Sequence, residues 1–178
     1  IDGILLYSEG DRYLLLRQFL AMQQGAPIPT LKQLEQIEQD VLLARPGADP
    51  VFQIGQSVLR RYRNHLFYFP RNPEYEPIEY RLEWDGESAI DVPDWPKLIT
   101  KDDLLKLGVP VAEVDWKNVT IRSRQGGEVC QPKGWHHAKP LKDCYQQYNV
   151  PPWARNRPIV FEGDHIIAVV DLFACIKD

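Results

Sequence analysis

The hydrophobic positions of the N-terminal part recur at the spacing of two amphipathic helices. Residues 15–22 repeat leucine and phenylalanine at that spacing after Ser8, a residue suited to cap a helix. Residues 31–42 carry a clearer apolar stripe after Thr30 and Gln33, which together form a capping-box pattern. The sequence therefore predicts two helices at the start of the chain.

Three short strands and a proline-rich linker are expected next. The predicted strands are residues 51–55, 58–63 and 66–69. Pro70, Pro73 and Pro77 then fall among polar residues, and proline neither extends a helix nor donates to a sheet. We therefore expect a domain at residues 1–70, a linker at 71–77 and a second domain at 78–178.

In the second domain, apolar residues of 78–84 alternate with charged ones, which predicts a half-buried strand. Asp85-Gly86 predicts a hairpin turn leading to Ile90 and Val92. The remaining predicted elements are a helix at 101–107, a strand at 119–124, a helix at 139–148 with Pro140 at its first position, strands flanking Gly163-Asp164, and a last strand within 172–176. The expected fold class is α+β, with two small domains of a few helices on a short, mostly antiparallel sheet.

Composition excludes several classes of protein. The chain has 178 residues, of which 44% are hydrophobic and 26% charged, as in folded globular domains. No apolar run approaches the roughly 18 residues of a membrane-spanning helix, so we expect no membrane association. Cys130, Cys144 and Cys175 match no disulfide or C-x-x-C pattern, which favours reduced structural thiols in a cytoplasmic protein.

The charge is uneven along the chain. The net charge is −4, but residues 71–115 carry 5 basic and 12 acidic side chains, whereas residues 116–160 carry 8 basic and 2 acidic ones. A local charge of +6 favours an anionic partner. A solvated face paired with the acidic stretch explains the same pattern, and the charges alone do not separate these interpretations.

The most informative stretch places four cations near one predicted helix start. Arg122 and Arg124 lie on the same face of a predicted strand, about 6.6 Å apart. Lys139 and Lys142 fall at the start of the predicted helix, where cations oppose the helix dipole but suit a bound anion. This arrangement predicts binding to a nucleic-acid backbone.

Further candidates for nucleic-acid contact surround these four residues. They are Lys133, Trp135, His136, His137, Arg155 and Arg157, with a second cluster of Arg60, Arg61 and Arg63. Trp135 would either stack on a base or close its own loop, and the second cluster would either bind RNA or flank a hairpin. We expect no metal site, because adjacent histidines do not easily share one ligand geometry. No catalytic motif is present, so no catalytic residue is predicted.

Four separated motifs carry a family resemblance. They are Arg122-Ser-Arg-Gln-Gly-Gly-Glu128, Lys139-Pro-Leu-Lys142, Val150-Pro-Pro-Trp-Ala-Arg155 and Gly163-Asp164. In this order they resemble the C-terminal domain of tRNA(Ile)-lysidine synthetase (TilS). Residues 8–70 resemble, more loosely, the middle substrate-binding domain of that family, and residues 71–121 show little similarity.

The resemblance implies a tRNA-modifying ligase. Enzymes of this family use ATP with Mg and lysine to convert the wobble cytidine of the isoleucine tRNA with a CAU anticodon into lysidine. Their chemistry lies in an N-terminal PP-loop domain whose Ser-Gly-Gly-x-Asp-Ser loop is absent here. The resemblance thus implies a tRNA-recognition portion that binds no cofactor itself, with a homodimer as a further expectation. Two alternatives remain: a protein-interaction or dimerisation module, and an enzyme that uses His136 or His137.

Overall fold

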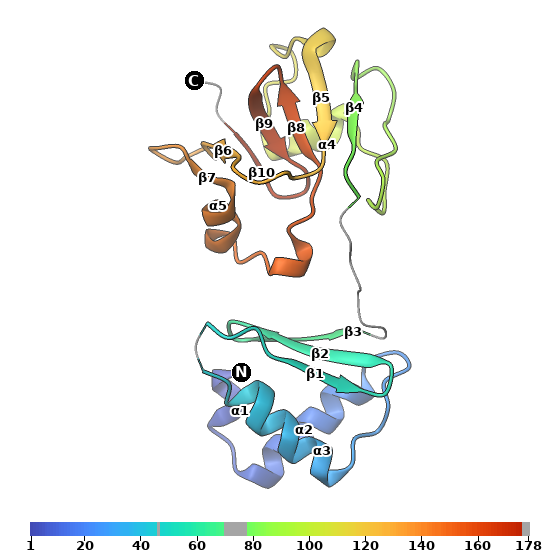
Figure 1. The fold of residues 1–178 in the computed structure, drawn as a ribbon, viewed down its shortest axis with the longest axis vertical. Coiled ribbons are helices and arrows are strands. Elements are labelled where there is room, and N and C mark those ends of the chain that lie inside the picture. Colours follow the sequence, from blue (N-terminus) through green and yellow to red (C-terminus); the bar gives the residue numbers. More distant parts are fainter. Residues whose placement is uncertain (46, 70–77, 176–178) are drawn as a thin grey trace. The chain divides into compact units, whose positions relative to one another are not determined.

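The computed structural model describes residues 1–45, 47–69 and 78–175, and the chain divides into two compact units, residues 1–74 and 75–178. The linker predicted at residues 71–77 lies outside the described residues. Both units combine helices with antiparallel sheets, which confirms the α+β fold class (Figure 1). Among the described helices, none is long and apolar enough to cross a membrane.

Unit 1 packs its helices on one face of a three-stranded antiparallel sheet of order β1-β2-β3 (Figure 1). Its elements are α1 (Asp2–Leu5), α2 (Glu9–Ala21), α3 (Leu31–Ile37), the π-helical turn η1 (Glu38–Leu42), β1 (Val51–Ile54), β2 (Ser57–Tyr62) and β3 (His65–Phe69). Apart from the short α1, which the sequence pattern did not predict, these agree with the predicted helices and strands.

Local capping explains where the helices of unit 1 begin. The Ser8 hydroxyl accepts a hydrogen bond from the Asp11 amide at the start of α2. Thr30 and Gln33 form the predicted capping box at the start of α3. Apolar residues of α2, α3, η1 and β2 then form the core, which contains Leu16, Leu20, Leu34, Ile37, Val41, Leu42 and Leu59.

Unit 2 contains a five-stranded antiparallel sheet of order β10-β9-β8-β5-β4 and a separate two-stranded sheet. Its elements are β4 (Arg81–Glu83), α4 (Lys101–Leu107), the 3-10 turn η2 (Trp116–Asn118), β5 (Val119–Arg122), β6 (Val129–Cys130), β7 (Lys139–Pro140), α5 (Leu141–Gln147), the 3-10 turn η3 (Pro152–Ala154), β8 (Ile159–Glu162), β9 (His165–Val169) and β10 (Phe173–Ala174).

Both faces of the large sheet are covered, because every residue of β8 is buried. Val160 belongs to a core cluster with Leu104 of α4, whereas Ile159 and Phe161 belong to a second cluster with Leu141 of α5. Successive residues of a strand point to opposite faces, so α4 and α5 lie on opposite sides of the sheet. The second cluster supports the segment around α5, which carries most of the predicted site.

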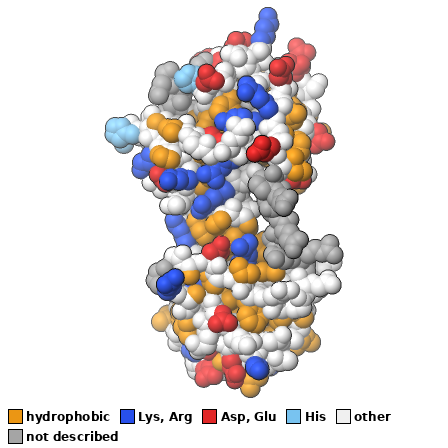
Figure 2. Space-filling view, viewed as in Figure 1, with side chains coloured by type: hydrophobic (Ala, Val, Ile, Leu, Met, Phe, Trp, Pro, Cys, Tyr) orange, Lys and Arg blue, Asp and Glu red, His pale blue; other side chains and the backbone are white. Residues whose placement is uncertain are grey.

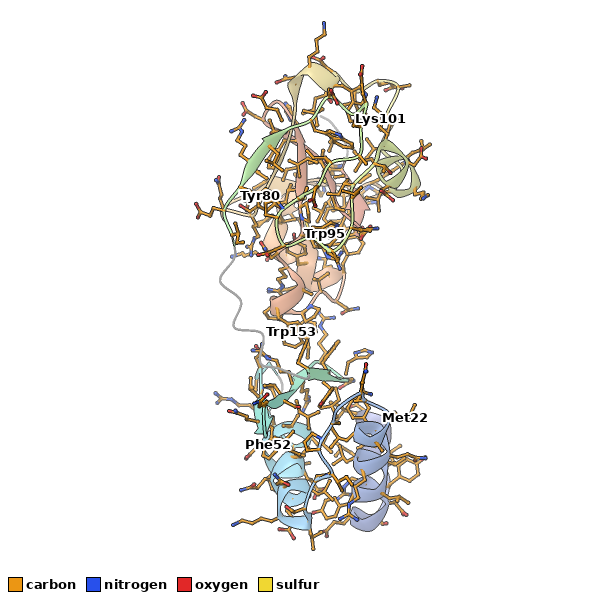
Figure 3. All side chains as sticks on the ribbon, turned by 90° about the vertical axis from the view of Figure 1, so that its right-hand side faces the viewer. Met22, Phe52, Tyr80, Trp95, Lys101 and Trp153 are labelled. Atoms are coloured by element: carbon orange, nitrogen blue, oxygen red, sulfur yellow. The ribbon has the colours of Figure 1, made fainter. Side chains whose placement is uncertain are left out.

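The predicted hairpin at Asp85-Gly86 is wrong. Strand β4 pairs with β5, with Leu82 opposite Ile121, and Ile90 forms an isolated bridge to Ile99. Gly86 serves close packing instead, because a Cβ atom there would lie 2.4 Å from the Trp116 ring. Lys101, labelled in Figure 3, starts α4 with its ammonium 4.4 Å from the centre of that same ring.

Candidate nucleic-acid interface

Strand β5 ends at Arg122, two residues before the predicted end, so Arg124 lies just beyond it, and Ile121 and Ser123 are buried. Both guanidinium groups, however, meet the carboxylate of Glu128. The distances are 3.1 Å from Arg122 Nη1 to Glu128 Oε1 and 3.8 Å from Arg124 Nε to Glu128 Oε2. Both guanidinium groups are therefore paired with a carboxylate of the chain itself, and their contact with RNA stays a prediction.

The backbone and the core hold this cluster further. Glu128 Oε1 accepts hydrogen bonds from the amides of Gln125, at 2.6 Å, and Gly126, at 3.1 Å, and its side chain is 2% exposed. The Arg122 guanidinium carbon lies 4.2 Å from the centre of the Phe161 ring. We call Arg122, Arg124 and Glu128 the carboxylate clamp, because the carboxylate ties the end of β5 to the loop that follows it.

The pKa of Glu128 lies below its ordinary value. Burial favours the neutral carboxyl, but the amides of Gln125 and of Glu128 itself and the Arg122 guanidinium outweigh it. A carboxyl whose pKa is lower in the folded than in the unfolded protein contributes stability that is present above the unfolded pKa. That contribution is lost as the pH falls through the folded pKa.

We therefore expect acidification below about pH 4.3, the ordinary glutamate pKa, to destabilise unit 2 in part through Glu128. Urea unfolding followed between pH 3 and pH 7 measures this. The free energy of unfolding of Glu128→Gln should depend less on pH over that range than that of the wild type. Parallel pH profiles for the two proteins would contradict the assignment.

The predicted start of the second-domain helix requires a correction. Helix α5 begins at Leu141 with Pro140 as its cap residue, and Lys139 belongs to β7, where it pairs with Cys130. The Lys139 ammonium lies 5.3 Å from the centre of the Trp135 ring. Lys142 does lie in the first helical turn, where its side chain is exposed. The two lysines are therefore not a pair at a helix end.

The loop between β6 and β7 is built on stacked aromatic rings. Trp135 stacks on Tyr148 with ring centres 5.8 Å apart, and Tyr148 stacks on Phe173 at 4.7 Å. This supports the interpretation that Trp135 closes its loop. His136 and His137 are exposed on the same loop, and with Lys139 they line a pocket of about 330 Å³.

Two predicted arginines of unit 2 bind the main chain. Arg155 Nε donates to the Val150 carbonyl at 3.0 Å. Arg157 Nη1 donates to the Val170 carbonyl at 3.2 Å, and its guanidinium carbon lies 5.7 Å from the centre of the Trp95 ring. The Arg155 contact closes the turn around η3, and the Arg157 contacts join the segment before β8 to the rest of the unit.

Arg61 of unit 1 has a similar structural role. Its Nη1 atom donates to the carbonyls of Val41, Leu42 and Ala44 at 3.2, 2.7 and 3.0 Å, at the end of η1. The last carbonyls of a helix lack a donor within the helix, and here the guanidinium supplies one. Arg60 lies 3.5 Å from the Asp49 carboxylate, and Arg63 lies 5.7 Å from the Tyr62 ring centre at the β2–β3 turn.

We expect Arg61→Met to lower the free energy of unfolding of unit 1 by about 1.5–3 kcal/mol, because three partly buried carbonyls lose a charged donor. Amide hydrogen exchange at buried Leu42 and Leu59 measures the loss. Arg17→Met removes an exposed arginine of the same unit and should change exchange little. Equal exchange rates in the two variants would contradict the structural role.

The remaining cations define a smaller candidate interface. We call Lys133, His136, His137, Lys139 and Lys142 the basic loop surface, because they lie on or beside the β6–β7 loop. Figure 2 shows Lys and Arg side chains close together on unit 2, with histidine at its edge. Lys142 has no ion-pair or hydrogen-bond partner among the described residues. Lys133 and Lys139 each make one contact within the fold, to the Gly108 carbonyl and the Trp135 ring, and neither is paired with a carboxylate in the described residues.

Neither a metal site nor a reactive thiol emerges from the described residues. No group of three His, Cys, Asp or Glu side chains there has the geometry to hold a metal ion. Cys130, Cys144 and Cys175 are buried free thiols, and the first two have sulfur atoms 3.9 Å apart. Burial raises the pKa of Cys144 to about 12, so its reactive thiolate form is scarce at neutral pH.

Two family models match separate parts of the chain. The TilS substrate binding domain matches residues 2–67, and the TilS substrate C-terminal domain matches residues 119–177. The chain belongs to the TilS family. Both parts of the predicted resemblance are thereby confirmed, and the carboxylate clamp and basic loop surface fall within the TilS C-terminal domain.

Relatives named tRNA(Ile)-lysidine synthase match nearly the whole chain. Those of Pectobacterium atrosepticum and Serratia proteamaculans are 35% and 32% identical over 97% of it, and that of Coxiella burnetii is 35% identical over 90%. The chain spans 35–38% of the length of these relatives. The similarity to these relatives covers the two TilS domains that the family models match, the substrate binding domain and the substrate C-terminal domain.

Sequence reasoning missed Glu128 as an organising residue. It stands six residues after Arg122 and four after Arg124, within the motif itself. An acidic residue at that distance, beyond two glycines that permit a tight turn, was the available signal. Because Glu128 already neutralises both arginines, they need no external anion such as RNA phosphate to balance their charge.

Proposed function

We propose that this chain is the tRNA-recognition part of a tRNA(Ile)-lysidine synthetase. The observation that carries the proposal is the match of one segment in each unit to a TilS substrate domain. The whole enzyme would use ATP with Mg and lysine to modify the wobble cytidine of the isoleucine tRNA with a CAU anticodon. The residues that perform this chemistry would lie outside the chain, in the cytoplasmic enzyme's PP-loop domain.

The basic loop surface would contact the RNA backbone. A-form stems are bound through phosphates and 2′-hydroxyls across the shallow minor groove, which favours exposed cations on a supported loop. Lys133 and Lys142 are exposed, and His136 and His137 extend from a loop anchored by stacked rings. The carboxylate clamp would position this surface by fixing the chain between β5 and β6.

Binding of tRNA by the full chain tests the proposal. Fluorescence anisotropy should detect a complex whose affinity falls steeply as the salt concentration rises, because binding releases counterions. A DNA duplex of similar length should bind more weakly, since it lacks the 2′-hydroxyls and the A-form shape. No complex at low salt, or equal affinity for the duplex, would contradict the proposal and favour a protein-interaction or dimerisation module.

A further inference from the structure

Unit 2 contains a second, larger pocket of about 470 Å³ that shares only Lys133 with the proposed backbone contacts. Val109, Val114 and Ile167 form apolar walls. Lys133, Glu113 and Glu162 provide charged groups around them. A volume of this size falls in the range of small-molecule sites, which combine apolar walls with a few polar groups.

The pocket adjoins the basic loop surface through Lys133. The Lys133 ammonium lies 3.2 Å from the carbonyl of Gly108, the residue that ends α4 in a left-handed conformation. A cation is favourable at a helix C-terminus, where carbonyl groups point outward. Gly134 follows Lys133 in the chain and already lines the smaller pocket with His136. One loop thus borders both pockets.

The polar groups of the pocket select a class of ligand. Glu162 is buried, and its Oε1 atom accepts a hydrogen bond from the Asp115 amide at 3.1 Å, which fixes its orientation. Glu113 is exposed at the rim. Carboxylates accept hydrogen bonds from the exocyclic amino groups of bases. Apolar walls suit the flat face of a base, and Lys133 suits its phosphate.

We propose that this pocket receives one unpaired, amino-bearing base of a bound RNA, with its amino edge toward Glu113 and Glu162 and its phosphate beside Lys133. The inference rests on the proposed tRNA binding and names a site for a single nucleotide within it. Sequence-specific recognition of RNA mostly uses such unpaired nucleotides, because bases within an A-form stem are poorly accessible.

Short single-stranded RNAs test the proposal by NMR of the full chain. Tetranucleotides of adenosine, cytidine or guanosine should shift the methyl signals of Val109, Val114 and Ile167, whereas the uridine tetranucleotide should shift them less. Uracil lacks an exocyclic amino group. A parallel titration uses free mononucleotides. If free AMP shifts these methyl signals as much as or more than the adenosine tetranucleotide does, the pocket binds free nucleotides and its RNA role is overturned.

Substitutions provide a second, independent readout. Val114→Trp fills the pocket from a half-buried position and should lower the tRNA affinity about fivefold or more. Leu105→Trp adds the same ring at a position 55% exposed outside the pocket, and should leave the affinity unchanged. Glu113→Gln alters an exposed side chain and should weaken the preference for amino-bearing bases without unfolding the protein.

The outcomes separate this inference from the proposed function. Salt-dependent tRNA binding without methyl shifts in the pocket, or with equal affinities for the wild type and Val114→Trp, would overturn the base pocket alone. The absence of any tRNA complex would overturn both proposals.

Discussion

Glu128→Ala should destabilise unit 2 by about 3 kcal/mol, the low end of the roughly 3–5 kcal/mol expected when one partner of a buried charge pair is removed. The substitution leaves the guanidiniums of Arg122 and Arg124 without their carboxylate and two loop amides without an acceptor. The low end applies because the two arginine side chains are 16% and 30% exposed.

Tryptophan fluorescence during urea unfolding measures this loss. All five tryptophans, at positions 84, 95, 116, 135 and 153, lie in unit 2, so the signal follows that unit. Glu87→Ala removes an exposed carboxylate of the same unit and should change the free energy of unfolding by less than about 0.5 kcal/mol. A loss below about 1 kcal/mol for Glu128→Ala would mean that the clamp adds little to the fold.

Replacing Lys133, Lys139 and Lys142 by glutamine together should weaken tRNA binding by roughly 10- to 100-fold at low salt. These lysines supply the positive charge that the basic loop surface offers to phosphates. The fold should lose little, because Lys133 and Lys142 are exposed, the Lys133 hydrogen bond to the Gly108 carbonyl lies at the surface, and the contact of Lys139 with Trp135 is worth about 0.5–1 kcal/mol. Anisotropy titrations and urea unfolding measure the two effects separately.

A matched variant controls for net charge. Lys32, Lys106 and Lys117 are exposed lysines outside the basic loop surface, and replacing them by glutamine removes the same three charges. This control should bind tRNA almost as tightly as the wild type. Equal losses in the two triple variants would show that overall charge, rather than the loop, governs binding.

Elements with local signals were predictable from the sequence. Helix α4 runs from Lys101 to Leu107 as expected, because Thr100 and Asp103 form its capping box and Gly108 ends it with φ of +94°. The β2–β3 turn and the caps of α2 and α3 were found for the same reason. Each depends on residues within a few positions of one another.

Elements that depend on distant partners were not predictable. Strand β4 pairs with β5, about 40 residues later, although the Asp85-Gly86 pattern indicated a hairpin, and Gly86 packs against Trp116 instead. A single sequence does not show which strand a given strand will join. The Asp85-Gly86 pair showed that the chain turns at Gly86, but the sequence did not show that Trp116 packs against this glycine.

The candidate site was predicted in composition but not in the roles of its residues. The basic segment was recognised from charge, yet Arg61, Arg122 and Arg157 contact carbonyls or a carboxylate of the chain itself. Arginine suits such contacts because its planar donors reach several acceptors at once. The exposed lysines and histidines remain the residues for which RNA binding is the simplest explanation.

The salt dependence of tRNA binding tests the central claim most directly, namely that the lysines of the basic loop surface bind RNA while the anchored arginines hold the fold. The slope of log K against log salt should become shallower by about 2–3 in the Lys133, Lys139 and Lys142 variant, at roughly 0.7–0.9 per lost phosphate contact. Arg157→Gln should destabilise unit 2 but leave the slope unchanged. The same slope for the wild type and the lysine variant would contradict the account.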